Sequence, residues 1–499
     1  MTPKLLTISK MGLSSLALST ALAACTVGPD YTPPKTELAL FHNAADASAA
    51  QGHSAPPLDR WWTGFDDPIL VTVVQRALNE NLDLDAALAR VRQARATASG
   101  AGVQLLPTVD LDASRTYEHQ SLNGAFGSVA NGSPGFHRDG HEDVVGPSAS
   151  WEIDLFGGLH REAAAADDEA QAAQAEQAGT RVTVAADTAD AYLQIRGYQA
   201  RLAVVQNQIG TDQHLIELVH NRVASGAATD REIAQAEALL KQARANVPPL
   251  RLALEQQLNR LDVLMGAQPG TYAKDLATVR DVPSIPAIPG DEHPIDVLRR
   301  RPDIIAAERR LAASDEQIGA AISDYYPKIS LSGALGFDSL NTSHLFTGNA
   351  FQAIGGGALR WRLFDYGKVD AEVAQARGAN AEALATYRQA VLKAAEDVED
   401  SLAGLAQTQA HVVELQDEAQ SLIKARDLAV EAYQGGSITL TDVLDADSQL
   451  LTVQDQVDAN RADAARAAVG VFRALGGGWD PEDEAPVRDA IAPTSASSS

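Results

Sequence analysis

The sequence predicts an α+β membrane protein that combines four β-strands with long coiled-coil helices and arises from an internal duplication. Three observations lead to this prediction: landmarks that recur at nearly constant spacing, segments in which apolar and polar residues alternate, and two very long helical runs. The composition agrees with it. Of 499 residues, 45% are hydrophobic but only 5% are aromatic, and this Ala-rich mixture favours helices that pack closely together.

The duplication is visible as matching landmarks in the two halves. The motif Leu105-Leu106-Pro107 recurs 220 residues later as Tyr325-Tyr326-Pro327. Three single residues recur 210 positions later: Trp151 as Trp361, Gly226 as Gly436, and Gly266 as Gly476. The difference of ten residues predicts a longer loop in the first half, between the proline and the tryptophan. Each half is therefore expected to contain a helix, a hairpin, a very long helix, a turn and a further helix.

Four segments alternate with the period of two that is typical of β-strands. They are residues 109–117, 145–155, 329–337 and 353–363, the last blurred by Gly355-Gly356-Gly357. Segments of about ten residues with aromatic ends fit a transmembrane barrel, although a soluble sandwich has the same pattern. Four strands cannot enclose a lumen, and open sheet edges are excluded from hydrocarbon. Several chains must then share one barrel, and two, three or four chains would satisfy this requirement.

Two polar and Ala-rich runs, 159–224 and 368–434, contain no proline. Each would extend about 100 Å as a single helix. Apolar residues within both runs keep a spacing of three and four, which is typical of coiled coils. Gly226 and Gly435-Gly436 are expected to form turns to antiparallel partner helices. Helices of this length indicate a bundle or a tube instead of a globule.

The N-terminus has the features of a secretory signal. Lys4 and Lys10 accompany an apolar stretch, 11–23, that is too short to span a bilayer as a helix. It ends in Leu22-Ala23-Ala24-Cys25, which resembles a bacterial lipoprotein cleavage site, and Cys25 is the only cysteine. We expect its thiol to carry a diacylglyceryl group that anchors the chain in lipid. An ordinary signal peptide with an incidental cysteine is the alternative. Thr26, in place of Asp, favours sorting to the Gram-negative outer membrane.

Charge and motifs exclude several classes of function. Asp and Glu number 66 against 40 Lys and Arg, a formal charge of −26, and no basic patch indicates nucleic acid binding. A tube with an acidic interior would admit cations more readily than anions. The sequence has no nucleophile elbow, phosphate loop, paired-Cys motif or His-Glu-x-x-His helix. We therefore predict no catalytic residue, no cofactor and no metal. His137 and His141 lie in a predicted loop without recognisable ligand spacing.

Several short motifs, in order along nearly the whole chain, resemble the outer-membrane efflux factor family, the TolC-like lipoproteins of tripartite pumps. They are Cys25-Thr26-Val27-Gly28-Pro29-Asp30-Tyr31, Trp61-Trp62 with Phe65 and Asp67-Pro68, Asp154-Leu155-Phe156-Gly157-Gly158, Arg301-Pro302-Asp303-Ile304 with Ala307-Glu308, Tyr326-Pro327, and Ala474-Leu475-Gly476-Gly477-Gly478-Trp479.

The resemblance implies a homotrimer with a 12-stranded outer-membrane barrel, a periplasmic α-barrel and an equatorial belt. It also implies docking to a periplasmic adaptor (membrane fusion) protein and to an inner-membrane transporter of the resistance-nodulation-division type. The expected function is a duct that carries small molecules such as drugs out of the cell. Two alternatives are a type I protein-secretion duct and a periplasmic structural coiled-coil lipoprotein.

The expected division of the chain follows the duplication. In order, it comprises the signal peptide (1–24), the acylated segment and belt (25–68), a periplasmic helix (69–106), a barrel hairpin (107–156), a long helix with its partner (157–266), a linker in the belt (267–300), a second periplasmic helix (301–326), a second hairpin (327–364), a second long helix with its partner (365–476) and a flexible tail (477–499).

The candidate functional residues lie at helix turns and strand ends. In the resembled family, acidic rings at the helix tips close the periplasmic end, and the matching stretch here is 439–447. This match implies that Asp445 lines the gate, with Asp442 and Asp447 as neighbours, although acids in a first helical turn also stabilise the helix dipole. Trp151 and Trp361 are expected to be interfacial anchors. Ser448 stands where family members often carry Arg, so a salt-bridged lock there is not expected.

Overall fold

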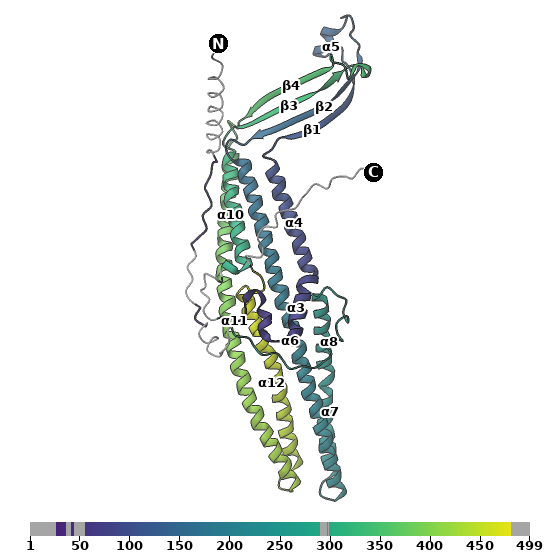
Figure 1. Ribbon diagram of the computed structural model, residues 1–499, viewed down its shortest axis with the longest axis vertical. Helices are drawn as coiled ribbons and strands as arrows, with labels where there is room; N and C mark the ends of the chain where they lie inside the picture. Colours follow the sequence, from purple (N-terminus) through teal and green to yellow (C-terminus); the bar gives the residue numbers. More distant parts are fainter. Residues whose placement is uncertain (1–25, 36–40, 44–54, 290–296, 298, 481–499) are drawn as a thin grey trace, which may run out of the picture. The chain divides into compact units, whose positions relative to one another are not determined.

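The computed structural model describes residues 26–35, 41–43, 55–289, 297 and 299–480. The predicted signal peptide, Cys25 and residues 481–499 lie outside this described part. The chain forms two compact units, each built from segments of both halves of the sequence (Figure 1). Of the described residues, unit 1 contains 26–34, 91–172 and 307–387, and unit 2 contains 35, 41–43, 55–90, 173–289, 297, 299–306 and 388–480.

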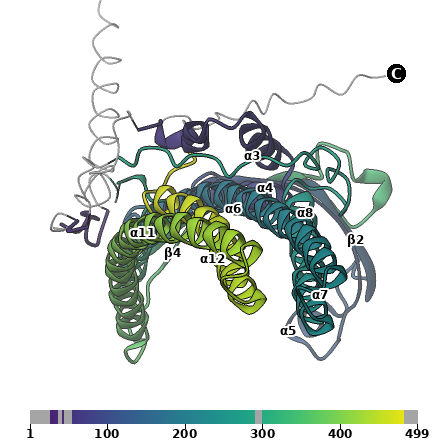
Figure 2. The same cartoon turned by 90° about the horizontal axis from the view of Figure 1, so that it is seen from below.

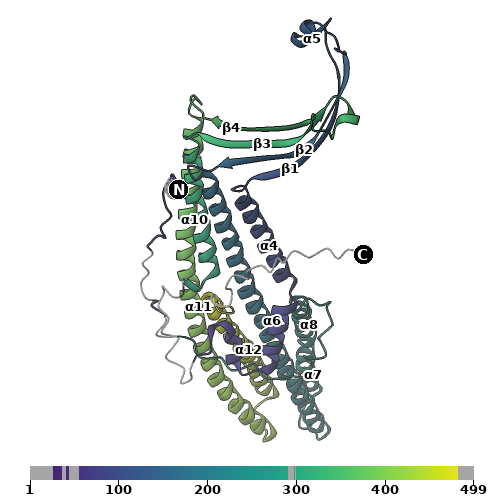
Figure 3. The same ribbon diagram turned by 45° about the horizontal axis from the view of Figure 1, so that its top comes forward.

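Unit 1 contains one antiparallel sheet whose strands lie side by side in sequence order (Figure 3). The strands are β1 (Thr108–His119), β2 (Asp139–Ile153), β3 (Lys328–Ser339) and β4 (Phe351–Arg360). All four predicted strands are present. The first hairpin has the longer loop, which contains the short helix α5 (Ala125–Ala130), whereas the second has the 3-10 turn η2 (Thr342–His344). The three consecutive glycines do not interrupt β4, because its register with β3 is continuous. The predicted fourth strand continued to Leu363, but β4 ends at Arg360.

The two faces of this sheet differ in chemistry. Successive side chains of a strand point to opposite faces, and the strand register shows which residues share a face. The apolar face carries mainly Val109, Leu111, Ala113, Val145, Pro147, Ala149, Trp151, Ile153, Ile329, Leu331, Leu335, Phe337, Phe351, Ala353 and Leu359; near the hairpin loops it also carries the ion pair between Arg115 and Asp143, at 2.8 Å. The charged residues of the polar face are Asp110, Asp112, Glu118, Glu142, Glu152, Lys328, Asp338 and Arg360.

Each hairpin is followed by a single helix of 67 residues, α6 (Gly158–Ala224) and α11 (Lys368–Gln434). Both match the predicted long runs. α11 is followed by the uninterrupted partner α12 (Leu440–Ala474), which lies beside it (Figure 2). The partner of α6 was expected as one helix, 230–265, but it consists of α7 (Asp230–Ala245) and α8 (Val247–Leu264). Two prolines at the start of α8 explain the break, because proline lacks the N–H that would continue the helix.

The remaining helices are α3 (Pro68–Glu80), α4 (Leu82–Val103) and α10 (Pro302–Ser323). The predicted helix 69–106 is thus two helices. Asn81 separates them, and its side-chain oxygen accepts from the backbone N–H groups of Asp83 and Leu84. In the part of the chain that the structure describes, no helix has an apolar stretch long enough to cross a membrane.

The core of unit 2 surrounds the short 3-10 helix η1 (Leu58–Phe65). Trp61 is fully buried and stacks on Phe472 of α12 with ring centroids 5.3 Å apart. Gly477 packs so closely that a Cβ there would lie 2.9 Å from the Trp61 ring. Trp479 is also buried, and its indole N–H donates to the Arg300 carbonyl at 3.1 Å. The prediction of a flexible tail from residue 477 is therefore wrong for 477–480, because aromatic packing holds these residues.

Candidate functional site

The two long helices end in turns built from equivalent residues. Gly226 and Gly436 adopt left-handed φ angles of +73° and +77°, which let each helix end and the chain reverse. Thr229 and Thr439 then begin α7 and α12 as the N-caps of capping boxes. The duplication thus extends to the details of both turns.

Asp442 completes the second capping box. Its carboxylate accepts hydrogen bonds from the Thr439 hydroxyl, at 2.6 Å, and from the Thr439 backbone N–H, at 2.9 Å. These hydrogen bonds, that of the hydroxyl above all, lower the pKa of Asp442. Its negative charge lies at the positive end of the α12 dipole. The residue has a structural role at the turn even though it is exposed.

Asp445 differs from Asp442 in its surroundings. Its side chain is exposed, and among the described residues it makes no hydrogen bond or ion pair. An exposed carboxylate of this kind can interact with a solute or with another copy of the chain. Of the three predicted gate residues, Asp445 therefore has the environment that fits an acidic ring best.

Asp447 is buried, with 1% of its surface exposed. Its carboxylate lies 3.0 Å from Nε of Arg426 on α11, so the pair joins α11 to α12. Burial raises the pKa of Asp447, and the Arg426 guanidinium opposes this shift. The structure thus gives the three predicted gate acids three different surroundings: a cap, an exposed site and a buried ion pair.

Sequence reasoning missed two polar residues of α6 near this ion pair. Gln208 donates from Nε2 to Oδ1 of Asp212 at 2.7 Å, and both side chains are buried. The pKa of Asp212 is raised to about 6, chiefly by burial and in part by the Asp447 charge, while the hydrogen bond from Gln208 and the Arg426 charge oppose the shift. The other carboxylate oxygen of Asp212 is buried and accepts no hydrogen bond from the residues that the structure describes. A signal was present, because both residues interrupt the apolar coiled-coil spacing between Val205 and Val219.

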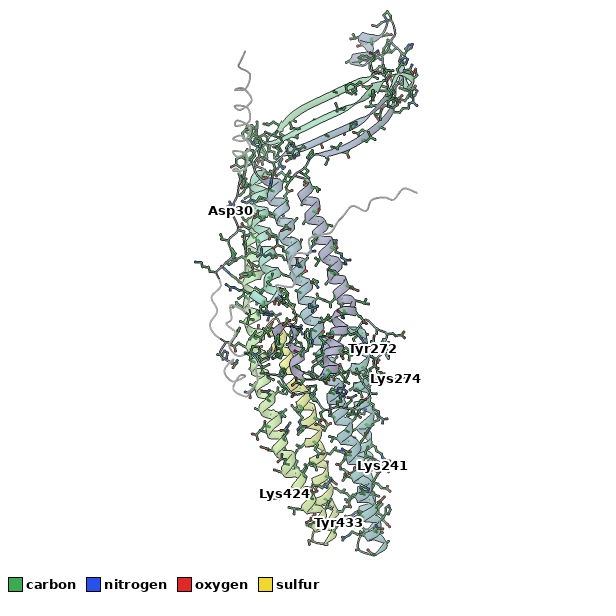
Figure 4. All side chains as sticks on the ribbon, viewed as in Figure 1. Asp30, Lys241, Tyr272, Lys274, Lys424 and Tyr433 are labelled. Atoms are coloured by element: carbon green, nitrogen blue, oxygen red, sulfur yellow. The ribbon has the colours of Figure 1, made fainter. Side chains whose placement is uncertain are left out.

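Arg222 and Tyr433 hold the ends of α6 and α11 together. The guanidinium donates to the Tyr433 backbone carbonyl at 2.7 Å and to the Gln434 carbonyl at 3.1 Å. It also lies 4.4 Å from the centre of the Tyr433 ring. Figure 4 labels Tyr433 near the end of α11 that leads into the turn. A cation on the last carbonyls of a helix complements its dipole, so Arg222 stabilises the end of α11.

The two predicted anchors lie at equivalent strand ends in unit 1. The Trp151 indole N–H donates to the Leu105 carbonyl at 2.9 Å, and that of Trp361 donates to the Tyr325 carbonyl at 3.0 Å. Their exposed fractions are 38% and 52%. Each ring is therefore fixed by its nitrogen while part of its surface faces outward, a geometry that suits a membrane–water interface.

The sequence matches the outer membrane efflux protein family over residues 73–267 and 294–477. The chain belongs to this family. It is 31% identical over 487 residues to the pyoverdine export outer membrane protein OpmQ of Pseudomonas aeruginosa, covering 96% of this chain and all of that protein. It is 29% identical over 481 residues to outer membrane protein OprJ of the same species, covering 94% and 96%. The solved outer-membrane channel OprN is 32% identical and has a TM-score of 0.83, covering 91% of this chain and all of that chain.

Membership of this family determines the oligomeric state of the protein and its location in the cell. Outer membrane efflux proteins are trimeric channels of tripartite pumps, and they work with periplasmic adaptor proteins and inner-membrane transporters of the resistance-nodulation-division type. The chain is therefore an outer-membrane efflux component that extends into the periplasm. The predicted fold class, four strands per protomer with long helices, is confirmed.

Proposed function

We propose that the trimer is the exit duct for small molecules, and not for secreted polypeptides. Chain-long similarity to efflux channels supports this proposal most strongly. OpmQ is named for pyoverdine export, and a further relative, TtgF of Pseudomonas putida, for toluene efflux. TtgF is 29% identical over 496 residues, covering 95% of this chain and 98% of that protein.

This proposal is tested in a Gram-negative host whose own efflux channels have been deleted. The chain is expressed with a compatible adaptor and transporter, and the cellular accumulation of a fluorescent small-molecule substrate is measured. Lower accumulation is expected than in cells with the empty vector. Unchanged accumulation, together with release of a polypeptide substrate when a type I secretion transporter is supplied, would contradict it.

We further propose that three copies of Asp445 form a cation-attracting ring at the periplasmic tip. The proposal is supported by the exposure of Asp445, its lack of a partner among the described residues and its place one turn after the α12 cap. Asp442 adds negative charge to the ring and also caps α12. Asp447 does not line the ring, but its ion pair with Arg426 holds α12 against α11 and so positions Asp445.

The membrane anchors complete the proposal. The position of Cys25 directly after two alanines supports its acylation. The partly exposed rings of Trp151 and Trp361 support their role as anchors at the membrane–water interface. Mass spectrometry of the mature N-terminal peptide tests the first point. A peptide without added acyl mass would contradict it.

A further inference from the structure

We propose that β4 of one copy pairs with β1 of the next in the register that β2 and β3 already have within the chain. This register places Arg360 opposite Asp112 of the neighbouring copy and Arg362 opposite Asp110 of the neighbouring copy. The inference rests on the trimeric assembly of the family. It adds to that assembly the pairs of residues that close the sheet between copies.

The two outer strands of the sheet are free edges. Every residue of β1 is exposed, and every residue of β4 is exposed except Gln352, which is partly buried. Unpaired backbone groups at an edge recruit another strand, and in a membrane they must have one. Strand directions alternate along the sheet, so β4 and a neighbouring β1 would meet antiparallel.

The duplication relates the two hairpins residue by residue. Adding 220 to β1 positions and 210 to β2 positions converts the pair Val109 and Ala149 into Ile329 and Leu359, which are paired in the structure. The same shifts convert the hydrogen bond from Trp151 to the Leu105 carbonyl into that from Trp361 to the Tyr325 carbonyl. The internal contact between β2 and β3 can therefore serve as the template for the contact between copies.

The β2–β3 register gives the proposed register between copies when 210 is added to each β2 position, which gives β4, and 220 is subtracted from each β3 position, which gives β1 of the neighbouring copy. The pair Trp151 and Leu331 becomes Trp361 and Leu111 of the neighbouring copy. Ser150 with Ser332 and Glu152 with Ser330 become the two Arg–Asp pairs. β2, which has a strand on each side, continues to Ile153, whereas β4 ends at Arg360. Pairing with a neighbour would extend β4 to Leu363, the end that the sequence pattern predicts.

Charge favours this register. Within the chain, Arg360 lies opposite Lys328, and like charges directly opposite each other are destabilising. Lys328 is paired with Asp324 at 2.9 Å, while Arg360 has no ion pair among the described residues. An acid from the neighbouring strand would compensate the Arg360 charge. A shift of two residues would keep the faces but lose at least one of the two pairs.

Aromatic packing supports the same arrangement. Phe156 stacks on Tyr326 with ring centroids 4.5 Å apart, joining the end of the first hairpin to the start of the second. Their equivalents by the same shifts are Tyr366 and Leu106. Both are strongly exposed, at 104% and 61%. In the proposed register Tyr366 packs against Leu106 of the neighbouring copy, and both apolar surfaces leave water.

Disulfide cross-linking tests the register. In the double variant Ala358→Cys with Ser114→Cys, the proposed register places the thiol at 358 of one copy directly opposite the thiol at 114 of the next. These positions are the equivalents of the paired residues Ser148 and Ala334. The control Ala358→Cys with Asp110→Cys uses the same face four residues away, roughly 13 Å along the strand. Such a separation is too great for a disulfide. Cys25 is retained in all variants, and each single-cysteine variant is run alongside.

The expected result is a covalent trimer on a non-reducing denaturing gel for the first variant and none for the control. Links in the control, or none in either variant while gel filtration shows an intact trimer, would overturn the register. A monomeric wild-type protein would overturn the trimeric assembly as well, so the two failures are distinguishable.

A double-mutant cycle tests the charge pair separately. Arg360→Gln and Asp112→Asn are each expected to lower the temperature at which the trimer dissociates in detergent, and together to lower it no further than one alone. The control cycle combines Arg360→Gln with Asp338→Asn, a carboxylate of the same face but a different register position, and should be additive. Additive effects in the first cycle would overturn the pairing of Arg360 with Asp112.

Discussion

The Arg426 guanidinium lies 3.0 Å from the buried Asp447 carboxylate and joins α11 to α12. This ion pair, the Arg222 contact with the end of α11 and the two capping boxes together define the conformation of the helix ends. At the strand ends, the indole hydrogen bonds of Trp151 and Trp361 fix the two rings in a similar way.

Removal of Arg426 should destabilise the helix ends. Arg426→Ala leaves the Asp447 charge buried without its counter-ion, and breaking a buried pair in this way costs about 3 kcal/mol. The melting temperature of the trimer, followed by circular dichroism at a helical wavelength, should fall clearly. Asp427→Ala is the matched control, because Asp427 contacts the same guanidinium from an exposed position. Equal melting temperatures for both variants would contradict the role of the buried pair.

Asp212 should make stability depend on pH. Burial raises its pKa from 3.8 to about 6, so folding favours the protonated carboxyl. Its stabilising contribution is fully present below pH 3.8 and is lost as the pH rises through about 6. Asp212→Asn should therefore weaken the fall in melting temperature across this range. An unchanged pH profile for Asp212→Asn would show that this carboxyl does not titrate as proposed.

The turn after α11 should tolerate a methyl group at one glycine and not at its neighbour. Gly436 has open space around it but a φ of +77°, so Gly436→Ala should cost about 1 kcal/mol through backbone strain alone. Gly435 lacks a positive φ, and Gly435→Ala should cost less. Hydrogen exchange of the amides on both sides of the turn measures the difference. Equal exchange in the two variants would argue against strain as the reason for glycine.

The polar face of the sheet should make the barrel prefer cations. It carries six acids and two bases in each chain, and three copies would line one lumen. Asp338→Asn should reduce the ratio of cation to anion permeability, obtained from the reversal potential across a salt gradient. Asp139→Asn is the control, since Asp139 lies on the apolar face. Loss of selectivity in the control alone would mean that the two faces have been assigned the wrong way round.

The Asp445 ring makes a separate electrical prediction. Asp445→Ala should lower cation selectivity and raise conductance, because the constriction loses charge and side-chain volume. Glu414→Ala, at an exposed acid of α11 away from the turn, should change neither. If both variants have the conductance of the wild type, Asp445 does not line the narrowest part of the channel.

Most of the fold could be predicted from the periodicity of apolar residues and from the spacing of the repeated landmarks. The offsets from Trp151 to Trp361 and from Pro107 to Pro327 predicted the duplication, and the two proline-free runs with apolar spacing of three and four predicted both long helices. The alternation of Val109 with Asp110 likewise predicted which face each residue of β1 occupies. Such patterns can be read without knowledge of tertiary contacts, because the period of a helix or strand depends on the backbone alone.

The surroundings of single side chains were not predictable in the same way. Asp442, Asp445 and Asp447 are alike in sequence, and only the packing of α11 against α12 makes one of them buried. The buried Asp212 was hidden for the same reason. Trp479 appeared to belong to the flexible tail because its partners, Ile305 among them, are distant in the sequence. Long-range contacts of this kind have no local signature.

The most direct test of a trimeric efflux channel is to measure the mass of the purified protein in detergent together with its conductance in a planar bilayer. We expect a trimer that opens discrete channels with a preference for cations. A monomer that produces no conductance would contradict it.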